Sequence, residues 1–283
     1  MHVQSLHIYP VKGARGIDVN NALLNLRGFA HDRRWVVTDD KGVFLTQREC
    51  SALARLIATP DGDSLKLESK DMEGSAQVKV APGAERETIR VWRDDIDAAD
   101  VGVDAAGWLS EALGRPARLF FMDDRATRTT SGQMASSAPV SFADGYPVLI
   151  VTAASLGALN EEIAASGGDA VPMARFRPNV VIDGAAPWGD DYWKAVKIGG
   201  VTFDLVKPCD RCVVTTKDQA SGASMGKEPL KSLARIRRSA DPRVNGVLFG
   251  WNAIPRNEGD ISVGDSVQVV EERPEGWPLA PIK

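Results

Sequence analysis

The sequence predicts a mostly β protein with α+β elements, organised as two domains. Three observations lead to this fold class. The first hundred residues contain closely spaced segments in which apolar and polar side chains alternate, as they do in half-buried strands. The second half mixes strands with helical patterns. Between the halves, residues 123–141 are rich in Ser, Thr, Ala and Gly without a period, and we place the domain boundary near this loop.

Short strands joined by turns fill the N-terminal part. Residues 34–38 lead into the turn 39–42 and return as 43–46, which is a hairpin signal. Further alternating segments lie at 64–68, 77–80 and 88–92. Strands at this spacing are typical of a barrel or a sandwich.

A short helix follows these strands. Asp104 is a suitable N-cap, and Trp108, Leu109 and Leu113 share one helical face. Gly114, followed by a proline, ends the pattern.

The second half mixes segments with the 3.6-residue period of a helix and segments typical of strands. Thr152 is predicted to cap a helix whose apolar stripe is Leu156, Leu159 and Ile163, and Gly167 closes it. A polar helix is predicted near residues 228–237, and the tail from Glu271 is predicted to be irregular. The predicted strands are 147–151, 179–182, the hairpin 196–198 with 201–205, 247–250 and 266–270.

Composition sets outer limits on function. The hydrophobic share of 43% and the charged share of 25% are those of an ordinary globular protein. A net charge of −4 gives no general attraction to nucleic acid or to anionic membranes. No secretory signal and no apolar run of about 20 residues is present. We therefore expect a cytoplasmic protein that binds neither nucleic acid nor membrane.

The stretch KPCDRCVVTT at 207–216 carries the most unusual chemistry. A cysteine thiolate is a reactive group and a soft metal ligand, and Lys207 and Arg211 favour it electrostatically. Three other interpretations of the cysteine pair stay open: a thioredoxin-like redox site, part of a structural zinc site, or two buried and inert thiols. The β-branched residues 213–216 predict a strand, which disfavours the thioredoxin-like site because that needs a helix.

The same stretch resembles the signature of the MOSC domain, named for the C-terminal part of molybdenum cofactor sulfurases. Five other segments are similar, in order, to the subgroup that contains the mitochondrial amidoxime-reducing component: IYPVKG (8–13), DRRWVV (32–37), RFRPNVVI (175–182), KEPL (227–230) and LFGWN (248–252). The resemblance implies an N-terminal β-barrel-like domain over residues 1–125. It also implies a MOSC β-barrel domain with flanking helices over residues 126–283, with a cofactor in the cleft between them.

The resemblance also implies a set of site residues. Cys212 would be the catalytic residue and the molybdenum ligand, and Cys209 would be a neighbour without an established metal role. Because the molybdopterin cofactor carries a phosphate, cations and polar donors are suited to bind it. Of the neighbours Arg33 and Arg34, only one can face the pocket if they lie on a strand, and the resemblance selects Arg33. The implied cofactor-binding residues are Lys12, Gly13, Arg33, Arg177, Asn179, Asp210, Arg211 and Asn252.

The implied activity is molybdenum-dependent reduction of small N-hydroxylated or N-oxide compounds. No cysteine follows Cys212, so we expect no intrinsic iron–sulfur cluster, and no pyridoxal phosphate is implied. Electrons would come from a separate ferredoxin, flavoprotein or haem protein. Two alternatives remain: a cofactor carrier or sulfur-transfer protein that uses a Cys212 persulfide, and an inactive protein that keeps the fold.

Overall fold

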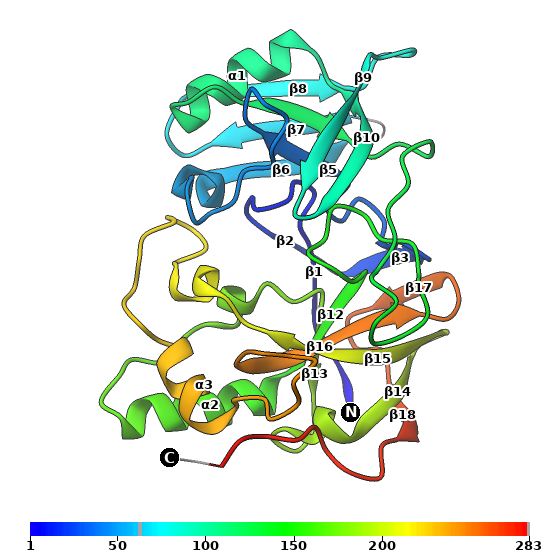
Figure 1. Ribbon diagram of the computed structural model, residues 1–283, viewed down its shortest axis with the longest axis vertical. Coiled ribbons are helices and arrows are strands. Elements are labelled where there is room, and N and C mark those ends of the chain that lie inside the picture. The colour runs from blue at the N-terminus through cyan, green and yellow to red at the C-terminus, as the bar shows by residue number, and fades with distance from the viewer. Residues whose placement is uncertain (62–63, 282–283) are drawn as a thin grey trace.

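The computed structural model describes residues 1–61 and 64–281 and has two lobes, drawn one above the other in Figure 1. The upper lobe contains β5 to β11 and α1, whereas the lower lobe contains β12 to β18 with α2 and α3. The predicted fold class, mostly β with added helices, is confirmed.

Two sheets and one helix build the upper lobe. The first sheet has the order β5-β11-β10-β9: β5 (Trp35–Thr38), β11 (Arg118–Phe121), β10 (Asp94–Asp100) and β9 (Arg86–Val91). The second has the order β6-β7-β8: β6 (Leu56–Asp61), β7 (Ser64–Ser69) and β8 (Ser75–Lys79). Alternation puts Leu65 and Leu67 of β7 fully in the core. The 3₁₀ helix η1 (Ser51–Arg55) leads into β6.

Helix α1 (Val103–Leu113) covers this lobe and buries Leu109 and Leu113, as predicted. The predicted N-cap was wrong. Gly102 is the N-cap, at φ 103°, and Asp104 lies in the first turn instead. A carboxylate in the first turn still interacts favourably with the positive end of the helix dipole. Gly114 ends the helix in the left-handed conformation, which glycine adopts without a steric cost.

The lower lobe is organised around one eight-stranded sheet, with the order β18-β14-β15-β16-β12-β13-β1-β2. Its core includes Ile150, Phe203 and Trp251, which are almost completely buried. The strands are β1 (His2–Ile8), β2 (Ile17–Val19), β12 (Val148–Thr152), β13 (Val180–Asp183), β14 (Trp193–Ile198), β15 (Val201–Asp210), β16 (Leu248–Pro255) and β18 (Val267–Glu272). A second sheet has the order β17-β3-β4: β17 (Gly259–Ser262), β3 (Asn21–Asn25) and β4 (Gly28–Phe29).

Helix α2 (Ala153–Ala165) connects the parallel strands β12 and β13. The side chain of Thr152 accepts a hydrogen bond from the amide of Ser155, which confirms the predicted cap. Helix α3 (Leu230–Ile236) packs beside α2. In the part of the chain that the structure describes, no helix is both long and apolar enough to span a membrane.

The N-terminal strands belong to the sheets of the lower lobe. β1 pairs with β13, and β3 pairs with β17, so residues far apart in sequence share a sheet. The chain then crosses into the upper lobe before β5. The boundary near residue 125 stays a prediction, and the strand pairing adds that the two halves of the chain are interleaved.

The lower lobe contains a cluster of buried charged side chains at the 3₁₀ helix η3 (Gly189–Tyr192). Asp191 forms two hydrogen bonds with Arg237, of 2.6 and 2.8 Å, and Trp188 packs against that guanidinium. Asp190 is 3% exposed, and its carboxylate accepts from the Ser155 hydroxyl. Burial, with Asp191 as a second cause, raises the pKa of Asp190 to about 7.

This pKa predicts how stability depends on pH. Because the folded protein binds the Asp190 proton more tightly than the unfolded chain, the stabilisation is complete below pH about 4 and is lost as pH rises through about 7. Asp190→Asn should therefore stabilise the protein at pH 8 by up to about 4 kcal/mol, and hardly at pH 4. Urea unfolding at both pH values measures this, with the exposed Asp124→Asn as control. An equal gain at both pH values would contradict the assignment.

Candidate functional site

A pocket opens where the two lobes meet. Its walls combine upper-lobe residues, such as Phe44 and Trp92, with lower-lobe residues from β15 and β16. The residues that the sequence singles out all line it: Lys12, Gly13, Arg33, Arg177, Asn179, Asp210, Arg211, Cys212 and Asn252. The structure therefore brings together side chains that are separated by up to 240 positions.

The cysteine pair lies at the end of β15. Cys209 belongs to the strand, and Cys212 precedes the 3₁₀ helix η4 (Val213–Thr216). The strand predicted for residues 213–216 was wrong. Thr215 donates its hydroxyl hydrogen to the Cys212 carbonyl, and Thr216 does the same to Val213, so the side chains stabilise a tight turn instead.

The two cysteines have different surroundings. Burial raises the pKa of the Cys209 thiol, although the Arg211 guanidinium lies 2.8 Å from its sulfur and acts in the opposite direction. Arg211 also donates to the Phe176 carbonyl at 2.6 Å, which fixes it beside the pocket. Cys212 instead lies near Arg48, which lines the same pocket from the upper lobe. The surroundings of Cys209 thus disfavour its thiolate form.

Tyr9 holds two arginines in the pocket wall. The guanidinium carbons of Arg33 and Arg177 each lie 4.2 Å from the centre of its ring. The Tyr9 hydroxyl donates to the Pro178 carbonyl, and burial raises its pKa to about 12. Burial lowers the pKa of Arg177 to about 10, so this guanidinium stays charged at neutral pH.

Arg33 and Arg34 do point to different environments, but not by strand alternation. Arg33 adopts the left-handed conformation at φ 49°, just before β5. It donates to Asp32 at 2.6 Å and to the Asn179 side chain at 3.0 Å, whereas Arg34 donates to the Met122 carbonyl at 2.8 Å. Arg33 therefore lines the pocket, and Arg34 braces the upper lobe.

The amide of Asn179 is engaged by protein groups. Its oxygen accepts from Arg33 and from the Leu149 amide, and its nitrogen donates to the His7 carbonyl. These bonds join β1, β12 and the approach to β13. We therefore expect Asn179 to position Arg33 rather than to contact a ligand directly.

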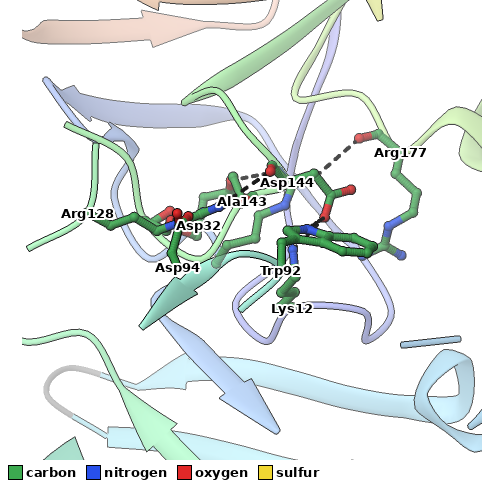
Figure 2. Close-up of polar contacts among 10 residues, drawn as sticks. Lys12, Asp32, Trp92, Asp94, Arg128, Ala143, Asp144 and Arg177 are labelled. Atoms are coloured by element: carbon green, nitrogen blue, oxygen red, sulfur yellow. Dashed lines mark hydrogen bonds and ion pairs between the residues drawn. The ribbon is translucent and has the colours of Figure 1, made fainter. Parts of the chain in front are cut away.

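Lys12 and Asp144 form an ion pair at one corner of the pocket, where the Lys12 side chain is buried and the Asp144 side chain is exposed. The Lys12 ammonium lies 2.5 Å from the Asp144 carboxylate, and Figure 2 shows both side chains together with Trp92. Burial lowers the pKa of Lys12, and Asp144 opposes this shift. Asp210 is paired outside this corner, 2.5 Å from Lys207.

Sequence reasoning did not single out several other pocket residues, among them Arg48, Trp92, Asp144 and Arg175. Arg175 lies inside the RFRPNVVI segment, two residues before Arg177, so that segment could have indicated it. The other three lie in turns and loops of the upper lobe and the connection to β12, where neither period nor spacing indicates a common pocket.

Two family models match the chain. The MOSC N-terminal beta barrel domain matches residues 1–116, and the MOSC domain matches residues 137–268. Mitochondrial amidoxime-reducing component 1 of Mus musculus is 32% identical over 287 residues, which cover 95% of this chain and 82% of that protein. This chain belongs to the MOSC family. The Homo sapiens protein of the same name is also 32% identical, over 285 residues with the same coverage.

This MOSC protein is also similar to a longer relative. Molybdenum cofactor sulfurase of Oryza sativa subsp. japonica is 29% identical over 297 residues, which cover 96% of this chain but only 35% of the sulfurase. Among solved structures, the YUAD protein from Bacillus subtilis aligns over 94% of this chain and 93% of its own, with 9% identity and a TM-score of 0.40. That structural likeness is too weak to carry an argument.

Two arginines in the pocket wall of this MOSC protein each carry a buried donor without a partner in the described residues. Arg175 is 6% exposed, and its Nε atom has no hydrogen-bond partner within the described part of the protein. The same holds for Nε of Arg211. Buried donors of this kind are rarely left unpaired, so a ligand with anionic oxygens would satisfy them. In residues 1–61 and 64–281 no three His, Cys, Asp or Glu side chains are grouped to hold a metal, which gives the zinc interpretation no support.

Proposed function

We propose that this MOSC protein binds a molybdenum–molybdopterin cofactor in the pocket between its lobes and reduces N-oxygenated compounds. The observation that carries the proposal is the convergence of Cys212 with the cations Lys12, Arg33 and Arg177 in one pocket. The relatives named for amidoxime reduction support the reaction class, and the relative named for the molybdenum cofactor supports the choice of cofactor.

The residues present fit this cofactor. Cys212 would supply a soft thiolate to the metal. Arg33, Arg175 and Arg177 offer guanidinium groups to the phosphate, and Lys12 adds a point charge. Gly13, at φ 81°, and Asn252 can present polar groups to the pterin.

The overall reaction balances with an external donor. An N-hydroxylated amidine, two electrons and two protons give the amidine and one water: the N–O bond breaks, the substrate is reduced, and a separate electron-transfer protein is oxidised. When bound, the molybdenum centre supplies the two-electron chemistry. The chain's own residues bind the cofactor, orient the substrate and exclude water.

The first test uses protein purified from a host that makes the cofactor. We expect near-stoichiometric molybdenum and pterin, and reduction of benzamidoxime to benzamidine when a chemical reductant such as dithionite-reduced viologen replaces the donor protein. Well-folded protein that contains neither metal nor pterin would overturn the proposal.

A second candidate function is sulfur transfer or cofactor carriage, which the similarity to the sulfurase favours. In that case Cys212 would hold a persulfide. Mass spectrometry of the purified protein distinguishes the two: a persulfide on Cys212 without bound metal supports transfer, and a metal-loaded protein with benzamidoxime turnover supports the reductase.

A further inference from the structure

A second cleft shares two arginines with the cofactor pocket. Arg175 and Arg177 line both, whereas Cys212 lines the cofactor pocket and is not among the described residues that line the second cleft. The second cleft is bounded by β1, β2, α2, the 3₁₀ helix η2 (Met173–Phe176) and residues 218–220. We call it the β1 cleft. The proposed cofactor contacts leave most of its side chains unused.

Three polar side chains in the β1 cleft form a continuous hydrogen-bonded chain. The Ser5 hydroxyl lies 2.9 Å from Nε2 of His7, and Nδ1 of His7 lies 2.7 Å from the Asp18 carboxylate. Because a carboxylate can only accept, Nδ1 of the neutral imidazole carries the hydrogen, and Nε2 accepts from the hydroxyl. In this arrangement a histidine can act as general base for a serine nucleophile.

The strands position this chain of side chains. Ser5 and His7 are two residues apart on β1, so their side chains leave the same face of the strand. Asp18 lies directly opposite His7 on the antiparallel strand β2. The His7 amide donates to the Asn179 carbonyl at 2.9 Å, and the Asn179 side chain donates to the His7 carbonyl at 3.1 Å. The backbone of the histidine is therefore fixed on both sides.

The opposite wall of the cleft offers apolar surface. Leu156 and Met173 pack against the core and remain partly exposed, and both line the cleft. Gly157 lies between them and the solvent in the middle of α2, where a Cβ would meet nothing within 4 Å. Glycine is unfavourable inside a helix, but here it leaves the cleft open. A short aliphatic chain can therefore pack against Leu156 and Met173.

Arg15 adds an unpaired cation to the same cleft. Its backbone amide donates to the Leu56 carbonyl at 3.1 Å, which fixes the backbone. Across residues 1–61 and 64–281, its guanidinium has neither a hydrogen bond nor an ion pair. The guanidinium is thus free to donate to an oxygen that becomes negative when a carbonyl carbon is attacked.

We propose that the β1 cleft is a second catalytic site, which hydrolyses esters of short aliphatic acids with Ser5 as the nucleophile. The Ser5 oxygen bonds to the acyl carbon while Nε2 of His7 takes the hydroxyl proton. The ester C–O bond then breaks, and His7 gives that proton to the departing alcohol. Water attacks the acyl carbon next, and His7 transfers a proton from this water back to the Ser5 oxygen. One ester and one water give one acid and one alcohol, and no electron is transferred.

A fluorophosphonate probe tests for an activated serine directly, because it reacts with such a hydroxyl to form a stable adduct. Peptide mass spectrometry of the labelled, purified protein should locate the adduct on Ser5, and heat-denatured protein should remain unlabelled. A well-folded wild type without an adduct on Ser5 would overturn the proposal, since the three side chains would then serve to join β1 to β2.

Hydrolysis of p-nitrophenyl butyrate tests the roles of the two catalytic residues. Ser5→Ala and His7→Gln should each lower kcat/KM by about 100-fold or more. Ser75→Ala, which changes an exposed serine on β8, should hydrolyse the ester like the wild type. Circular dichroism of each variant checks the fold. Hydrolysis by Ser5→Ala at the wild-type rate would contradict the assignment of the nucleophile.

Asp18 is a positioning residue, because it acts through His7. Its side chain is 89% exposed, so water can replace part of its effect. Asp18→Asn should lower kcat about tenfold and leave KM within about twofold, and Asp18→Glu should regain part of the lost kcat. An unchanged kcat in Asp18→Asn would overturn the role of this carboxylate.

Discussion

Replacing Cys212 with serine is expected to lower the molybdenum content of the purified protein by more than about tenfold. A serine hydroxyl is a hard and weakly acidic group, so it is a weaker ligand than a soft thiolate for a thiophilic metal. Because Cys212 lies at a pocket wall and not in the core, the variant should fold normally. Metal analysis and circular dichroism of the same preparations measure both effects.

The neighbouring cysteine provides the matched control. Cys209 is three residues away and lines the same pocket, but burial disfavours its thiolate form. Cys209→Ser should therefore retain most of the metal. Full metal content in Cys212→Ser, or equal loss in both variants, would contradict the assignment of Cys212 as the single thiolate ligand.

Breaking the buried pair of Asp191 and Arg237 should have the largest effect on stability. The two side chains are 8% and 6% exposed, and the Trp251 indole adds a third bond to the same carboxylate. Arg237→Leu leaves the Asp191 charge buried without its partner, and we expect a loss of about 3–5 kcal/mol in the free energy of unfolding. Urea unfolding measures this loss.

Two further variants make this prediction specific. Adding Asp191→Asn to Arg237→Leu removes the stranded charge, so the double variant should regain part of the lost stability. Arg90→Leu breaks a pair with Asp95 that is exposed on both sides, at 60% and 53%, and should unfold close to the wild type. A loss of less than about 1 kcal/mol in Arg237→Leu would show that Asp191 is not isolated from solvent.

Local signals were reliable where the local contact itself decides the structure. Thr152 caps α2 because its own side chain reaches the Ser155 amide, and such a bond is readable from spacing. The same reasoning failed at residues 213–216. β-branched side chains favour strands on average, but here two threonine hydroxyls bond back to preceding carbonyls and stabilise a turn.

Sequence motifs predicted part of the pocket lining, and the structure added residues that no motif indicates. All the cofactor-binding residues named from sequence line the pocket, yet their predicted roles did not include Asn179 as the support of Arg33. Arg48, Trp92 and Asp144 had no sequence signal, because their common position depends on how the two lobes meet. Their proximity comes from long-range packing, which no short window of sequence records.

The sequence by itself determined the mostly β class, most of the strand and helix positions and the family, and it singled out Cys212 as the proposed metal ligand. These properties follow from local periodicity, capping residues and the order of the motifs, all of which can be read directly from the sequence. Only the tertiary structure decided that β1 completes the sheet of the distant second half, and that Arg48 and Cys212 line one pocket. The reason is physical: strand pairing and lobe contact join residues that are far apart in sequence, so their geometry exists only once the chain has folded.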